Sequence, residues 1–273
     1  MDLRPWALAF TLLDWPERQK AALWAELQEG RDVALPGVMA EAMAGLLADL
    51  PRRRAEARDR GARLLLPGDP GVDPFLAPLP YPVALWVRGT LPPPGPRLAM
   101  VGSRQATARG KVRARAWARA VTEAGVAVLS GLARGIDGAA HLGALEAGGT
   151  WGILGSGLDH PYPPEHAGLM NRMVGAGGGV ITPFPPEAQP LKWHFPRRNW
   201  LLAAWTEGVL VVEAQRKSGS MVTAKLALDL GKELFVVPGS EGRDALLEEG
   251  AAHPATHPHA LLELLPGATP PRA

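Results

Sequence analysis

The sequence predicts an α/β protein: a doubly wound parallel sheet that follows a small all-helical N-terminal domain. From Arg97 onward, short apolar runs alternate with helix-like runs, which is typical of parallel strands joined by helices. The apolar runs are nearly continuous instead of alternating, as in strands buried on both faces. Before them, leucines recur at helical spacing, for example at Leu8, Leu12, Leu23 and Leu27.

These patterns predict the elements in chain order. A helical domain is expected over residues 1–65, and a Pro-rich junction over 67–96 encloses an expected edge strand at 81–89. The sheet domain is expected over 66–265, with a tail over 266–273. Its strands are expected at 98–101, 126–129, 151–154, 179–182, 209–212 and 234–237. Its helices are expected at 111–124, 137–147, 165–174, 198–205 and 221–230.

The composition sets broad limits. The chain has 273 residues, of which 47% are hydrophobic, enough for a folded core. It has no cysteine, which excludes disulfides and thiolate metal ligands and is typical of a reducing cytosol. Because no stretch resembles a membrane span or a secretory signal, we expect a cytoplasmic protein without membrane partners. The net charge of +2 permits a polyanionic partner without requiring one.

Four short loops rich in Gly and Ser follow predicted strands. They contain Gly102-Ser103-Arg104, Ser130-Gly131 with Arg134, Gly155-Ser156-Gly157, and Lys217-Ser218-Gly219-Ser220. Strand-to-helix loops of a parallel sheet all lie at its carboxyl edge. Glycines there bring backbone N–H groups and helix N-termini close to an anion, and Arg104, Arg134 and Lys217 add positive charge. The sequence therefore predicts a phosphate-binding groove.

A long segment at 183–196 combines aromatic and basic residues beside this groove. It holds Phe184, Lys192, Trp193, His194 and Phe195, and is followed by Arg197, Arg198 and Asn199. Aromatic rings stack on unpaired bases while cations hold the backbone, so the segment suits single-stranded nucleic acid. The alternative is that these aromatics belong to the core or an interface, where large aromatic side chains usually lie.

Carboxylates and histidines near the loops leave a choice between chemistry and structure. Asp137 and His141 are four residues apart on one helical face, which suits an acid/base or ligand pair, but Asp in a first helical turn also stabilises the helix. Glu213 follows the fifth strand and is a candidate general base, although orientation or structure is favoured because no matched second carboxylate is evident. We expect no catalytic residue, no metal site and no cofactor.

The motifs, taken together, resemble the DprA/Smf family in order and spacing. They include Gly102-Ser103-Arg104-Gln105-Ala106-Thr107, the run 130–137, Leu154-Gly155-Ser156-Gly157-Leu158-Asp159, Phe195-Pro196 before Arg198-Asn199, and Ser218-Gly219-Ser220. The resemblance covers about residues 80 to 252. It implies an extended Rossmann-like domain that binds single-stranded DNA without catalysis. It also implies protection of incoming DNA in natural transformation, loading of the RecA recombinase, and a homodimer.

The resemblance also assigns roles to particular residues. Arg104 is the best candidate DNA contact, Lys217 and the Ser218–Ser220 loop come next, and Arg134 and Arg198 follow. The chain departs from the family pattern at Trp200, where another Arg is usual, and at His166, where Asn is usual. We also expect it to lack the C-terminal winged-helix domain of many members. The full set expected at the DNA or phosphate site is Gly102, Ser103, Arg104, Ser130, Gly131, Arg134, Gly155, Ser156, Gly157, Phe195, Arg197, Arg198, Asn199, Lys217, Ser218, Gly219 and Ser220.

The rival reading is an enzyme that processes nucleotides, such as a phosphoribohydrolase with a similar sheet. Glu213 would then act as the base and the Ser218 loop would hold the phosphate. The Pro-Gly-Gly-x-Gly-Thr-x-x-Glu loop of those enzymes is missing, and Gly177-Gly178-Gly179 does not supply it. A dehydrogenase is disfavoured because the third glycine of a dinucleotide fingerprint would fall on His160.

Overall fold

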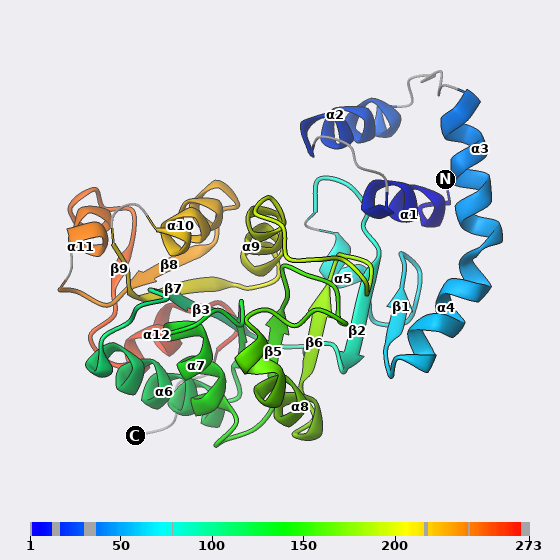
Figure 1. Cartoon of the computed structure of the whole chain (residues 1–273). Coiled ribbons are helices and arrows are strands. Elements are labelled where there is room, and N and C mark those ends of the chain that lie inside the picture. The colour runs from blue at the N-terminus through cyan, green and yellow to red at the C-terminus, as the bar shows by residue number, and fades with distance from the viewer. Residues whose placement is uncertain are drawn as a thin grey trace.

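The protein is described here by a computed structural model over residues 2–12, 17–29, 37–77, 79–215, 218–239 and 241–268. Its described part consists of a mixed sheet covered by helices on both faces, with further helices at one end (Figure 1). The strands are β1 (Arg63–Leu65), β2 (Leu85–Gly89), β3 (Arg97–Gly102), β4 (Ala127–Ser130), β5 (Thr150–Ile153), β6 (Gly179–Thr182), β7 (Gly208–Glu213), β8 (Glu233–Val236) and β9 (His253–Pro254).

The helices occupy three groups. Helices α1 (Arg4–Leu12), α2 (Glu17–Gln28), α3 (Gly37–Ala48) and α4 (Leu50–Asp59) lie at the β1 end of the sheet. One face of the sheet carries α6 (Ala108–Glu123), α7 (Ile136–Ala144), α8 (Ala167–Gly175) and α12 (Pro258–Leu264), with the short η1 (Pro164–His166) before α8. The other side carries α5 (Asp73–Leu76), α9 (His194–Ala204), α10 (Gly219–Asp229) and α11 (Glu241–Glu248).

The strand order places a switch point between β3 and β7. The order is β1-β2-β6-β5-β4-β3-β7-β8-β9, and the pairs from β6 through β9 are parallel. After β3 the chain winds outward through β4, β5 and β6, then returns to the other side of β3 and winds outward again. Ligands of open α/β sheets bind at the carboxyl end of the strands where the winding direction reverses. The topology therefore directs attention to the loops after β3 and β7.

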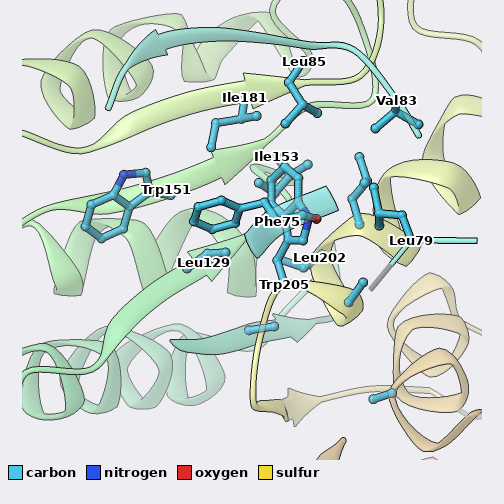
Figure 2. Packing of buried hydrophobic residues seen from close by; sticks show 14 of the residues in the cluster. Phe75, Leu79, Val83, Leu85, Leu129, Trp151, Ile153, Ile181, Leu202 and Trp205 are labelled. Carbon is cyan, nitrogen blue, oxygen red and sulfur yellow. The ribbon is translucent and has the colours of Figure 1, made fainter. Parts of the chain in front are cut away.

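The core lies between the sheet and the helices of each face. Figure 2 shows Phe75 and Trp205 at the centre of one cluster, with ring centroids 5.4 Å apart in an edge-on arrangement. Leu202 of α9 belongs to the same cluster as Ile153 and Ile181 of the sheet. Full burial of a large apolar side chain stabilises a fold by roughly 1.5–3 kcal/mol, so this cluster holds α9 firmly on the sheet. The position of α9 matters because it carries Arg198 and Asn199.

The predicted fold class is confirmed, with differences at the edge of the sheet and at one helix. Residues 63–65, expected at the end of the helical domain, form β1, which pairs antiparallel with β2. A strand, β2, does form within the expected range 81–89, but the prediction that it lies at the edge is wrong. It also pairs antiparallel with β6 and therefore lies inside the sheet. Helix α9 begins at His194, four residues before the expected start, so Phe195 and Arg197 are helical.

Candidate nucleic-acid interface

A crevice of about 470 Å³ opens at the switch point between β3 and β7. We call it the switch-point crevice. Its walls include residues 101–105, which form the end of β3 and the start of the loop after it. Gln215 and the segment 218–220 after β7, and Arg198 and Asn199 of α9, also line it. Ala133 and Asp137 complete it from the loop after β4 and from α7. Three of the predicted loops therefore do converge on one site.

Among the described residues that line this crevice, Arg104 is an exposed cation. The loop that carries Arg104 is held against the end of β7, because the backbone N–H of Ser103 donates to the carbonyl oxygen of Glu213 at 2.6 Å. The Arg104 side chain is exposed, and its guanidinium carbon lies 5.4 Å from the centroid of the Phe195 ring. A guanidinium over a ring keeps its N–H edges free to donate to two oxygens of one anion, so Arg104 is placed to receive a phosphate.

Two features hold the loop after β4 against the loop after β3. Gly135 has a φ of +78°, and a Cβ added there would fall on the carbonyl oxygen of Ser103. The backbone N–H of Ile136 donates to that same oxygen at 3.2 Å. Only glycine fits this close approach with a positive φ. The close contact at Gly135 therefore holds the loop that carries Arg134 against the loop that carries Arg104.

Two buried titratable residues, Asp137 and Arg198, line the inner part of the crevice. The Asp137 carboxylate accepts the backbone N–H groups of Gly131 at 3.1 Å and Ala133 at 3.3 Å. Arg198 is 4% exposed and donates to the carbonyl oxygens of Ile153, at 2.7 Å, and Gly131. Burial raises the pKa of Asp137, and the positive charge of Arg198 opposes that rise. Burial lowers the pKa of Arg198 to about 10, which leaves its guanidinium charged at neutral pH.

Beside the crevice lies a smaller depression, which we call the aromatic notch. It shares Arg104 and Arg198 with the crevice and adds Arg134, Tyr162 and Phe195. The rings of Tyr162 and Phe195 are 5.6 Å apart and tilted by 59°. Arg134 is exposed and donates to Glu165, with Nη2 and Oε2 3.0 Å apart. That carboxylate raises the pKa of Arg134, so the guanidinium stays fully charged.

Helix α10 begins at the rim of the switch-point crevice. Ser218 is its N-cap residue, in an extended conformation, but its side chain makes no capping hydrogen bond. Instead the hydroxyl groups of Ser218 and Ser220 lie 2.8 Å apart. Gly219 is exposed. The start of a helix carries a partial positive charge and unpaired N–H groups, so this rim is suited to an anion. The predicted Lys217 lies outside the described residues.

The predicted loop 155–157 does not reach the crevice. Gly155, Ser156 and Gly157 are buried. A Cβ on Gly155 would lie 2.8 Å from the Phe195 ring, and one on Gly157 would meet the carbonyl oxygens of Pro185 and Pro186. The segment at 183–196, which holds these contact residues, therefore covers the loop 155–157. These glycines allow close packing, and the structure does not present them to a phosphate.

Other predicted residues are also inside the protein. Ser130 is buried and donates to the carbonyl oxygen of Met100 at 2.6 Å. Gly131 is buried too, and its carbonyl oxygen accepts a hydrogen bond from the Arg198 guanidinium. Arg197 is 6% exposed and donates to the carbonyl oxygen of Phe10 at 3.3 Å, which ties α9 to α1. Ser130 and Arg197 line neither depression, whereas Gly131 borders the notch.

The aromatic segment divides between the two alternatives. Phe184 and His194 are buried and stack with centroids 3.8 Å apart, so they belong to the core. Trp193 is 48% exposed, and Lys192 is exposed. Phe195 is half-buried and lines the aromatic notch. The segment therefore offers Phe195 to a ligand at the notch, while Phe184 and His194 serve the fold.

The two candidate catalytic features have structural partners. His141 Nδ1 lies 2.9 Å from the Thr150 hydroxyl, and burial lowers the pKa of His141 to about 3. Glu213 accepts both the backbone N–H of Thr107, at 3.0 Å, and the Thr107 hydroxyl, at 2.7 Å. Thr107 in turn caps α6 by accepting from Gly110 at 3.0 Å. Glu213 thus fixes the start of α6 and does not line the crevice.

The predicted set omits several residues that line the site, among them four polar ones. Gln105, Gln215 and Thr223 line the crevice, and Tyr162 lines the notch. Tyr162 lies in the loop after β5, five residues beyond Gly157, and its contact with Phe195 places it at the notch. Gln215 lies in the loop after β7, two residues beyond the end of that strand. The rule that ligands bind at the carboxyl ends of the strands would have found it. Within the described residues, no cluster of His, Cys, Asp and Glu is arranged to hold a metal ion.

The fold and the site define a Rossmann-like α/β protein with a crevice at the switch point of its sheet, at which Arg104 is exposed. The family model described as DNA recombination-mediator protein A matches residues 77–266. Protein Smf of Escherichia coli is 41% identical over 211 residues, covering 74% of this chain and 56% of that protein. DNA processing protein DprA of Bacillus subtilis is 37% identical over 213 residues, covering 74% and 71%. The chain belongs to the DNA recombination-mediator protein A family.

Two solved structures extend the comparison to the fold. The crystal structure of DprA from Streptococcus pneumoniae superposes with a TM-score of 0.75 at 28% identity, covering 97% of this chain and 99% of that one. DprA from Helicobacter pylori, whose structure concerns a single-stranded DNA binding mode, gives 0.66 at 27% identity, covering 75% and 95%. The chain spans 56% of the length of the Escherichia coli relative and 62% of the Streptococcus pneumoniae relative. No described helix is long and apolar enough to cross a membrane.

Proposed function

We propose that this protein binds single-stranded DNA in the switch-point crevice and the aromatic notch. Phosphates lie against Arg104 and the start of α10, and an unpaired base contacts Phe195 at the notch. The observation that carries the proposal is the convergence of the β3, β4 and β7 loops around one exposed guanidinium. The family membership and the relative with a described single-stranded DNA binding mode support it.

The proposed contacts explain which kind of binding to expect. Phosphate contacts carry little sequence information, so the affinity depends weakly on base sequence. Base–ring stacking is also tolerant of sequence, because every base has a flat face. Duplex DNA cannot offer an unpaired base to Phe195. We therefore expect single strands to bind more tightly than duplexes of equal length.

The substitution Arg104→Ala tests the proposal. A hydrogen bond to a charged group contributes about 1.5–3 kcal/mol, so the affinity for an oligothymidylate should fall roughly tenfold or more. The slope of log affinity against log salt concentration should become shallower by about 0.7, because one phosphate contact is lost. Fluorescence anisotropy over a salt series measures both. Arg104 is exposed, so the melting temperature should stay unchanged.

The matched control is Arg119→Ala. Arg119 is also exposed, but it lies on α6 and donates to Glu123 at 2.7 Å. Its replacement should leave affinity and salt slope as in the wild type. Equal affinity of wild type and Arg104→Ala would overturn the proposal. So would an equal loss in both variants, because the effect would then reflect net charge alone.

The wider role belongs to the same proposal. We propose a cytoplasmic, non-catalytic mediator that protects incoming DNA in natural transformation, loads RecA onto it and acts as a homodimer. The engagement of Glu213 by Thr107 supports the non-catalytic part, because the rival phosphoribohydrolase reading needs that carboxylate as a free base. Release of a base from nucleoside monophosphates by the purified protein would favour the rival reading.

A further inference from the structure

We propose that Trp193 is a second stacking platform for an unpaired base of the bound DNA, beyond the aromatic notch. The platform rests on the proposed function and deepens it, because it adds a base contact to a strand that is held at the switch-point crevice. The indole ring would stack on the flat face of a base, which every nucleotide offers. The chain would then hold bases of one strand at two places, Phe195 and Trp193.

The indole of Trp193 is exposed, although large aromatic side chains mostly lie in cores or interfaces. Trp193 keeps 48% of its surface in solvent. Among the large hydrophobic side chains that are exposed in the described part of the chain, it is the aromatic one. Leaving so much apolar surface in water is unfavourable. A base stacked on the ring would remove that surface from water.

Two other rings hold the buried side of the indole. Phe184 and His194 are buried and stack on each other, with centroids 3.8 Å apart. The Trp193 ring meets His194 edge-on at 4.1 Å and Phe184 edge-on at 6.1 Å. These contacts orient the indole without covering it. A ring that is already held in place loses little conformational freedom when a base stacks on it, which favours binding.

Trp193 lies at the same edge of the sheet as the aromatic notch. The segment 183–193 follows β6 and lies against the loop after β5, where the backbone N–H of Gly157 donates to the carbonyl oxygen of Ala188 at 2.8 Å. That loop continues to Tyr162, which lines the notch. A strand that follows the carboxyl edge from the crevice past the notch would therefore come next to the segment that carries Trp193.

The side chains of Trp193 and Phe195 point to different sides of the start of α9. The backbone of Trp193 is already helical, and residues two apart in a helix diverge by roughly 200°. Gly155 adjoins both sides: a Cβ on it would meet the Phe195 ring, and its carbonyl oxygen lies 3.2 Å from Nδ1 of His194. An α-helix with its side chains is about 10–12 Å across, so the two rings can hold different bases of one strand.

The platform does not depend on charge. The segment before α9 carries the exposed Lys192 and the exposed Glu187, which have opposite charges. What the segment offers at Trp193 is therefore a ring for a base. Removal of the ring should lower the affinity without changing its dependence on salt, because no phosphate contact is lost.

Replacement of the ring tests the platform, with DNA that lacks bases as the reference. Trp193→Leu keeps an apolar side chain but removes the flat ring. Anisotropy titrations use an oligothymidylate of about 20 nucleotides and an abasic strand of the same length. Trp193→Leu should bind the oligothymidylate at least about fivefold more weakly than the wild type, with an unchanged salt slope. It should bind the abasic strand as tightly as the wild type, which also shows that its DNA site is folded.

Two further variants are matched controls. Trp193→Phe keeps a flat ring at the same position, so it should stay within about twofold of the wild-type affinity for the oligothymidylate. Leu191→Ala shortens a side chain of the same segment that is 45% exposed but has no ring. It should also stay within about twofold, because bases stack on aromatic side chains.

The outcomes separate the platform from the proposed function. If Trp193→Leu binds the oligothymidylate like the wild type while Arg104→Ala binds it weakly, the platform is wrong and the crevice stands. The platform is also wrong if Trp193→Leu loses affinity for both strands equally, or if Trp193→Phe or Leu191→Ala loses as much as Trp193→Leu, because the ring would then not be what the DNA contacts. If Arg104→Ala binds both strands like the wild type, the proposed function itself fails.

Discussion

At the scale of single residues, the protein divides its arginines between ligand and fold. Arg104 is exposed at the crevice, whereas Arg197 and Arg198 are buried and donate to backbone carbonyl oxygens. The sequence predicted that all three are basic residues of the groove, because the sequence alone does not show in which direction an arginine side chain points. The direction of a side chain from α9 depends on how that helix packs on the sheet, and a motif does not contain that information.

Gly135 carries a prediction about the link between the two loops. The variant Gly135→Ala should lower the free energy of unfolding by roughly 2 kcal/mol or more, because the new Cβ combines a strained positive φ with a clash against Ser103. DNA affinity should fall as well, since the Arg104 loop must shift. Urea unfolding and anisotropy measure the two effects.

Gly61→Ala is the control for Gly135→Ala. Gly61 has a φ of +66°, but an added Cβ would meet open space. Only the backbone strain remains there, at about 1–2 kcal/mol, and DNA affinity should not change. If Gly135→Ala and Gly61→Ala lowered stability equally and left binding intact, the contact between Gly135 and Ser103 would have no part in shaping the site.

At the scale of elements, the sequence predicted most strands and helices within a few residues. Buried parallel strands are apolar throughout, and this makes β3 to β8 visible without a structure. The three-residue β1 has no such signal, so the inner position of β2 could not be predicted. The glycines at 155–157 resembled the other loops in sequence. Only their contact with the segment at 183–196 shows that they are covered.

Helix α10 carries a prediction in which stability and binding change in opposite directions. In Ser218→Asp, a carboxylate at the helix start should raise the free energy of unfolding by about 0.3–1 kcal/mol. The same carboxylate would repel a phosphate at the crevice rim by about 1 kcal/mol, which is roughly a fivefold loss of affinity. Thermal melting measures the expected gain in stability, and fluorescence anisotropy measures the expected loss of DNA affinity.

Ser218→Asn is the matched variant, because it offers an uncharged capping oxygen of similar size. It should keep the affinity of the wild type. Weaker binding by Ser218→Asn to the same extent as by Ser218→Asp would point to a steric effect. Unchanged binding by Ser218→Asp would place the phosphates away from α10.

At the scale of the whole molecule, one topological fact accounts for the site. Because β7 returns to the far side of β3, the loops after these two strands separate and leave a crevice between them. The sequence predicted that the loops would converge, since alternating strands and helices imply a common carboxyl edge. It could not predict that Asp137 of α7 and Arg198 of α9 are buried close enough to affect each other's pKa, since the two helices lie on opposite faces of the sheet.

The most direct test of the account is a crystal structure of the protein with a short oligothymidylate. The account predicts a backbone phosphate within hydrogen-bond distance of the Arg104 guanidinium, a second phosphate at the start of α10, and an unpaired base against the Phe195 ring. A strand bound elsewhere, with Arg104 and the rim at Ser218 left in solvent, would contradict it.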